Sequence, residues 1–153
     1  MTAIAFRANM GSNTQSVPNA TNTKINLGAT DFNVGGAFDL ANVRFQPTVA
    51  GYYKVDLRVG WDSLSGGQNS GAFIYKNGVT ISGSFLPGST GGGSGLGAQL
   101  SDLVFLNGSS DYLEMWGSQA SGGNSNVTTD ENYTHFSAFL VYETVTQPPA
   151  RDC

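Results

Sequence analysis

The side chains that could take part in catalysis are few and lie far apart in the sequence. The chain has one histidine, His135, and the residues after it alternate so that Phe136 faces the opposite way. A general base must lie within hydrogen-bond reach of its partner, and no nucleophile or carboxylate adjoins His135 in the sequence. No G-x-S-x-G motif or second histidine is present, and the eleven acidic residues form no recognisable pair of opposed carboxylates. The sequence therefore predicts that the protein is not an enzyme.

Residues that could bind a metal or a phosphate are equally sparse. The glycine run at 91–93 lacks the lysine and the following helix that a phosphate-binding loop needs. Asp130 and Glu131, or Asp62, could offer oxygen ligands to calcium, but the acidic residues are not densely spaced. Cys153 is the single cysteine, which excludes an internal disulfide. We expect no cofactor, with calcium left open as a weak alternative.

Composition and charge exclude further classes of function. The chain of 153 residues has a net charge of −4, and its seven basic residues are scattered singly. Without a basic patch we expect no nucleic-acid partner. No apolar run reaches the length of a membrane span, and the N-terminus lacks the apolar core of a signal peptide. We therefore expect a protein that is either cytosolic or released without a cleavable signal, for example by cell lysis.

One stretch, residues 51–61 (GYYKVDLRVGW), has the clearest periodicity in the chain. Tyr53, Val55 and Leu57 alternate with Tyr52 and Lys54, and the pattern continues to the end of the stretch. Strict alternation over this length is typical of a β-strand with one buried face. We expect this strand to lie at the centre of the core.

The rest of the chain shows short apolar alternations separated by turn signals and polar loops. Asn77–Gly78 and Asn107–Gly108 each lie between apolar runs, which predicts two hairpins. Residues 100–106 are apolar nearly throughout, which predicts a buried strand. The pattern as a whole indicates an all-β, antiparallel sandwich or jelly roll of about ten strands. We expect a single domain over residues 1–143 and an extended tail over 144–153. Strands are predicted at residues 4–8, 24–27, 31–38, 42–45, 51–61, 72–76, 79–85, 100–106, 112–116 and 134–142.

The order of several motifs resembles the globular heads of the C1q/TNF-like jelly-roll family. The residues that carry the likeness are Phe45, Pro47, Gly51, Tyr52 and Tyr53, then the hairpin at 75–78, then the run at 136–141. The resemblance implies a ten-strand jelly roll, a compact homotrimer and recognition through exposed loops. Neither a signal peptide nor a collagen-like stalk is found, so the chain is more similar to the stalkless heads of phage and bacterial proteins.

Apolar residues on both faces of the predicted strands indicate a second buried surface. Tyr52 lies opposite Tyr53, and Phe139 lies opposite Phe136. A trimer interface would cover the outer residues, and the alternative is a sheet more fully enclosed by its own chain. The candidate residues for a trimer interface or the core are Tyr52, Tyr53, Phe136, Phe139 and Tyr142.

Two functions remain open. The first is a virion structural protein, a capsid decoration, head fibre or fibre tip, located at the virion surface and bound to other virion proteins. The second is an extracellular module that recognises a host-surface receptor or a glycan through its loops at 62–71, 87–97 and 117–132. These loops contain almost no aromatic residues, with only Tyr133 at a border, which favours the structural function. The candidate loop residues are Ser63, Gln68, Asn69, Ser89, Thr90, Gln119, Asn124 and Asn126.

Overall fold

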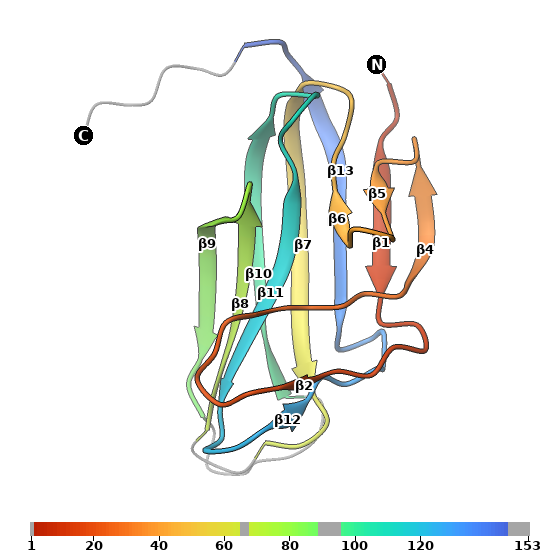
Figure 1. Cartoon of the computed structure of the whole chain (residues 1–153). Helices are drawn as coiled ribbons and strands as arrows, with labels where there is room; N and C mark the ends of the chain where they lie inside the picture. The colour runs from red at the N-terminus through yellow and green to blue at the C-terminus, as the bar shows by residue number, and fades with distance from the viewer. Residues whose placement is uncertain (1, 65–67, 89–95, 147–153) are drawn as a thin grey trace, which may run out of the picture.

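The computed structural model describes residues 2–64, 68–88 and 96–146. In these ranges the chain forms strands, turns and loops (Figure 1). No helix in the described ranges is long and apolar enough to cross a membrane. The strands are β1 (Ala5–Asn9), β2 (Ser16–Val17), β3 (Thr23–Lys24), β4 (Ala29–Val34), β5 (Phe38–Asp39), β6 (Arg44–Phe45), β7 (Gly51–Trp61), β8 (Asn69–Lys76), β9 (Val79–Leu86), β10 (Leu96–Leu106), β11 (Leu113–Ala120), β12 (Ser125–Asn126) and β13 (His135–Glu143).

Two antiparallel sheets make up the sandwich. One sheet, here called the β7 sheet, has the order β10-β7-β13-β1-β4. The other, the β11 sheet, has the order β5-β6-β11-β8-β9, and β3 also pairs with β11. Strands distant in the sequence are neighbours in both sheets, as the crossovers of a jelly roll require. The predicted all-β jelly-roll class is confirmed.

The predicted central strand is confirmed with the same bounds as β7. It pairs along its whole length with β10 and along most of its length with β13. Tyr53, Val55 and Val59 are fully buried, Leu57 is 2% exposed, and the alternate residues from 52 to 58 are half-buried. Because β7 is hydrogen-bonded on both sides and apolar on one face, its position fixes the positions of the neighbouring strands.

The core at one end of the sandwich is a cluster of aromatic rings from five strands. The Phe6 ring stacks at 4.7 Å on Phe38 and at 4.7 Å on Phe45, and it meets Phe136 edge-on at 5.0 Å. Tyr53 packs against Phe45 at 5.3 Å, and its hydroxyl donates a 2.8 Å hydrogen bond to the Val49 carbonyl. Burial, reinforced by the negative charge of Glu143, raises the pKa of Tyr53 to about 12. Offset and edge-on ring contacts of this kind join the two sheets.

One of the two predicted hairpins is confirmed and the other is wrong. At Asn77–Gly78 both residues have positive φ, and β8 pairs with β9 across the turn. At Asn107–Gly108 the chain instead crosses from the β7 sheet to the β11 sheet, because β10 pairs with β7 while β11 pairs with β8. The crossing is stable because the Asn107 side-chain oxygen accepts three backbone N–H bonds from residues 109–111, an Asx-type turn.

The prediction that residues 100–106 are buried throughout is also wrong. Val104 and Leu106 face the core, whereas Leu103 is 55% exposed and Phe105 is half-buried. Successive side chains of a strand point to opposite faces, so an unbroken apolar run places apolar groups on both. The outward-facing residues of β10 therefore belong to a second apolar surface.

Asp111 holds the crossing loop to the neighbouring hairpin. Its carboxylate accepts hydrogen bonds from the Asn77 side chain at 2.8 Å and from the Asn107 backbone at 3.0 Å. Lys76 Nζ lies 3.2 Å from the same carboxylate and donates a 2.8 Å bond to the Phe105 carbonyl. Burial alone raises the pKa of Asp111, but the hydrogen bonds from Asn77, Lys76 and Asn107 and the charge of Lys76 outweigh it. The net effect holds the pKa below its ordinary value of 3.8.

Replacing Gly108 tests the geometry of the crossing. Its φ is +71°, and a Cβ there would lie 2.4 Å from the Ala50 backbone nitrogen. Gly108→Ala should therefore lower the free energy of unfolding by about 2 kcal/mol or more, measured by urea denaturation. Gly122→Ala is the matched control, because Gly122 has a φ of +84° but open space around it, and it should cost only about 1 kcal/mol. Equal losses from the two variants would contradict the close approach at Gly108.

Asp111→Asn tests the contribution of the buried ion pair. At neutral pH the variant should lose about 2 kcal/mol of unfolding free energy, because it removes a charged hydrogen-bond acceptor. A lowered folded-state pKa stabilises the protein above the ordinary pKa and loses this effect as the pH falls through the folded value. The difference between wild type and variant should thus shrink below about pH 4. A difference that stays constant through acid unfolding would contradict this.

Candidate assembly and recognition surfaces

The outer face of the β7 sheet carries a row of residues in register across all five strands, in which Lys54 of β7 is flanked by apolar side chains. Strand pairing aligns Leu103, Lys54, Phe139, Ala5 and Val34 in one row. Leu103, Phe139 and Val34 are 55%, 50% and 47% exposed. Three large apolar side chains in one row on an exposed sheet face leave unusually much apolar surface in contact with water.

The neighbouring row on the same face adds aromatic rings. Phe105 pairs with Tyr52, their rings lie 5.6 Å apart, and Tyr52 pairs with Tyr142, which is 63% exposed. Unbroken alternation over the predicted strand at 134–142 would place Tyr142 on the same side as Phe136 and Leu140, but the structure places it on the outer face. The register shifts between Leu140 and Tyr142, so the alternation along β13 breaks there.

The two rows together form a surface that we call the assembly face. It consists of Val34, Tyr52, Leu103, Phe105, Phe139 and Tyr142. Among the candidate interface residues, Tyr53 and Phe136 belong to the core, whereas Tyr52, Phe139 and Tyr142 lie on this outer surface.

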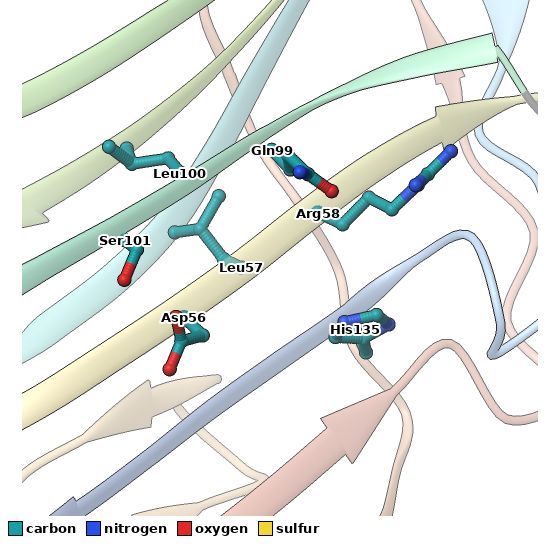
Figure 2. A pocket seen from close by; sticks show the side chains of 7 residues that line it. All are labelled: Asp56, Leu57, Arg58, Gln99, Leu100, Ser101 and His135. Atoms are coloured by element: carbon teal, nitrogen blue, oxygen red, sulfur yellow. The ribbon is translucent and has the colours of Figure 1, made fainter.

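A polar hollow lies beside these rows, farther along the same sheet face. It has a volume of about 370 Å³ and is lined by Asp56, Leu57, Arg58, Gln99, Leu100, Ser101 and His135 from β7, β10 and β13 (Figure 2). His135 Nδ1 lies 3.0 Å from the Glu131 carbonyl, and Lys54 Nζ binds the Ser101 hydroxyl. Among the described residues no hydrogen bond joins His135 to Ser101 or Asp56. The hollow thus brings together a histidine, a serine and an aspartate without forming a catalytic relay between them.

The edge strand β9, which lies next to β10 of the other sheet, carries further exposed apolar side chains. Val79 and Phe85 are 65% and 66% exposed, and Ile81 and Leu86 are 44% and 43% exposed. Within the described structure β9 pairs with β8 and ends the β11 sheet. We call these four residues the edge patch. An exposed apolar edge strand favours association with another chain unless it is covered.

Aromatic rings also gather on the outer face of the β11 sheet. Tyr75 and Trp116 stack in parallel, with ring centroids 4.1 Å apart and an interplanar angle of 12°. The Arg44 guanidinium lies 4.7 Å from the centre of the Tyr112 ring. The prediction missed this cluster because it sought aromatic residues in loops, although Tyr112 and Trp116 alternate with the core residues Leu113 and Met115 in the printed sequence.

The structure places the predicted loop residues in different environments. Ser63 and Asn124 lie in exposed loops, and Gln68 is half-buried. Asn69 begins β8, and Asn126 lies in β12. The described residues do not include Ser89, Thr90, the glycine run at 91–93 or Cys153. Gln119 is a wrong prediction, because it lies in β11 and is only 1% exposed. Its amide nitrogen donates to the carbonyls of Val17 and Gly123, at 2.8 and 2.9 Å. Polar side chains can be buried when they are hydrogen-bonded in this way.

The residues considered for calcium have local partners instead. The Asp130 carboxylate accepts two 2.9 Å hydrogen bonds from Asn132, and Glu131 accepts one from Asn9 at 3.3 Å. Asp62 is exposed. Within the described ranges no three histidine, cysteine or acidic side chains lie together as a metal site would need.

Known proteins share the architecture but little of the sequence. No family model and no curated protein sequence matches the chain. Among solved structures, Eiger TNF from S. frugiperda has a TM-score of 0.69 at 11% identity, with 100% of both chains covered. The globular domain of zebrafish complement 1qA has a TM-score of 0.63 at 13% identity, with 93% of this chain and 99% of that chain covered. The PRD1 vertex protein P5 has a TM-score of 0.60 at 15% identity, with 92% and 96% covered. The chain therefore has the C1q/TNF-like jelly-roll fold.

Proposed function

We propose that the protein is a non-enzymatic structural head that assembles as a homotrimer and decorates the surface of a virion. The observation that carries the proposal is the presence of two sets of exposed apolar side chains, the assembly face and the edge patch. Each contains several side chains that are 40% exposed or more. Large apolar side chains exposed in such numbers mark interaction sites on a soluble protein.

The positions of the two surfaces determine how copies would associate. The assembly face spans the β7 sheet, whereas the edge patch lies on β9, on the far side of the β11 sheet from β1 and β4 (Figure 1). One copy can therefore place its edge patch against the assembly face of the next. Contacts between two different surfaces repeat head to tail and close into a ring when the rotation allows it. A ring of three is the closure that the C1q/TNF-like resemblance implies.

The location on a virion rests on two further observations. Charged residues make up only 12% of the chain, and the long loops contain mainly glycine, serine, threonine and asparagine. A neutral polar surface of this kind suits the outside of a particle. Among the structures with the same fold, one is named a vertex protein. Immunogold electron microscopy of particles from the source culture tests this location, because label on purified particles supports it and label confined to the soluble fraction contradicts it.

A single charge in either apolar surface should disrupt the trimer. Phe139→Asp removes the centre of the assembly face, and Phe85→Asp removes the single aromatic ring of the edge patch. We expect each variant to have the mass of a monomer in light scattering, because burying a charge in an apolar interface costs several kcal/mol. Val145→Asp is the control. Val145 is 90% exposed and lies outside both surfaces, so this variant should remain a trimer.

Mixing the two variants tests the head-to-tail arrangement itself. Phe139→Asp keeps an intact edge patch and Phe85→Asp keeps an intact assembly face, so an equimolar mixture should form a dimer with one intact contact. An interface that joins the same surface of both copies would instead give dimers of whichever variant keeps that surface, without any mixing. Soluble trimers from each variant alone would contradict the proposed interface.

A further inference from the structure

The outer face of the β11 sheet carries a ring cluster that the proposed assembly does not use. In β11, Leu113 and Met115 are buried in the core, at 0% and 2% exposure. Tyr112, Glu114 and Trp116 alternate with them and therefore point to the outer face, where Glu114 is largely covered, at 8% exposure. Tyr112 and Trp116 are four residues apart, which places them about 13 Å apart along the strand.

The rings of this cluster are held in place. Trp116 stacks on Tyr75, and its indole N–H donates to Glu114 Oε1 at 3.4 Å. The Tyr75 hydroxyl accepts a 3.2 Å hydrogen bond from the Asn22 side chain. All three rings are half-buried, so each keeps some surface in contact with solvent while its neighbours restrict its rotation. A site built from fixed rings loses little conformational entropy when it binds a ligand.

Hydrogen-bonding groups surround the rings. Glu114 lies between Tyr112 and Trp116 along the strand and forms an ion pair with Lys24. Lys24 Nζ also donates a 2.7 Å bond to the Asn42 carbonyl. Arg44 lies over the Tyr112 ring at the other end of the cluster. Donors and acceptors therefore lie on both sides of the row of rings.

We propose that this surface, defined by Tyr75, Tyr112, Glu114 and Trp116 and here called the aromatic platform, binds an oligosaccharide. Sugar rings present C–H groups that pack on aromatic faces, and their hydroxyl groups both donate and accept hydrogen bonds. The platform offers the same combination, with rings at its two ends and the Lys24–Glu114 pair between them. Its length accommodates more than one sugar ring.

A sugar fits the platform better than a second protein chain does. The core of a protein interface is rich in large apolar contacts, and most of the exposed aliphatic residues in the described ranges lie on the assembly face and the edge patch. The platform combines rings with charged and amide groups instead. It lies on the sheet opposite the assembly face, and its nearest neighbour among the two apolar surfaces is the edge patch, because Tyr75 pairs with Thr80 on β9.

The two tryptophans of the chain make binding directly observable. Trp61 is fully buried in the core, whereas Trp116 is half-buried on the platform. We would titrate the full-length protein with maltotriose, cellotriose, chitotriose and lactose and follow its fluorescence. Saturable quenching or a spectral shift with at least one sugar at millimolar concentration is expected. No change with any of the four sugars would overturn the proposal.

Variants assign the signal to the platform, with affinity measured by calorimetry. Trp116→Ala and Tyr112→Ala should each weaken binding of the active sugar about tenfold. Trp116→Phe preserves a ring against Tyr75 and should weaken sugar binding less than Trp116→Ala does. Tyr133→Ala is the matched control, because Tyr133 is an exposed ring on another surface. Unchanged affinity in the folded platform variants, or an equal loss in the control, would overturn the assignment. The trimer mass, measured in parallel, distinguishes this result from a failure of the assembly proposal.

Discussion

The structure depends on the pairing of one strand, β7, on both of its edges. β10 and β13 bond to it in antiparallel register, and one of its faces closes the core with Tyr53, Val55 and Trp61. Because side chains alternate along a strand, the same pairing aligns the outward residues of three strands in rows. The strand pairing that forms the core therefore also determines where the exposed rows of the assembly face lie.

The two sheets of the sandwich have different outer surfaces, and this difference is the physical basis of the proposed division of roles. The β7 sheet has aliphatic and aromatic rows beside a polar hollow, and the edge strand β9 supplies a second apolar surface. The β11 sheet has rings framed by an ion pair and amides. Apolar surfaces are stabilised by association with another copy, whereas fixed rings with polar neighbours can remain in water and bind a small polar ligand.

Much of the fold could be predicted from the sequence, because β7 and the Asn77–Gly78 hairpin are determined by local patterns. The crossing at Asn107 could not be predicted, because an Asn-Gly pair can form either a hairpin turn or a crossover between sheets. Only the long-range pairing of β10 with β7 decides between the two. The irregular register near Tyr142 and the burial of Gln119 likewise depend on contacts with distant residues. Apolar residues on both faces did predict the assembly face, whereas the aromatic platform escaped notice because its rings lie on a strand.

The mass of the wild-type protein in solution tests the central claim most directly. Two unpartnered apolar surfaces on one chain should associate, and light scattering on a size-exclusion column should give three times the subunit mass of 16.0 kDa. This trimer should persist on dilution into the micromolar range, as expected for a large apolar interface. A stable monomer with both surfaces exposed to water would contradict the account.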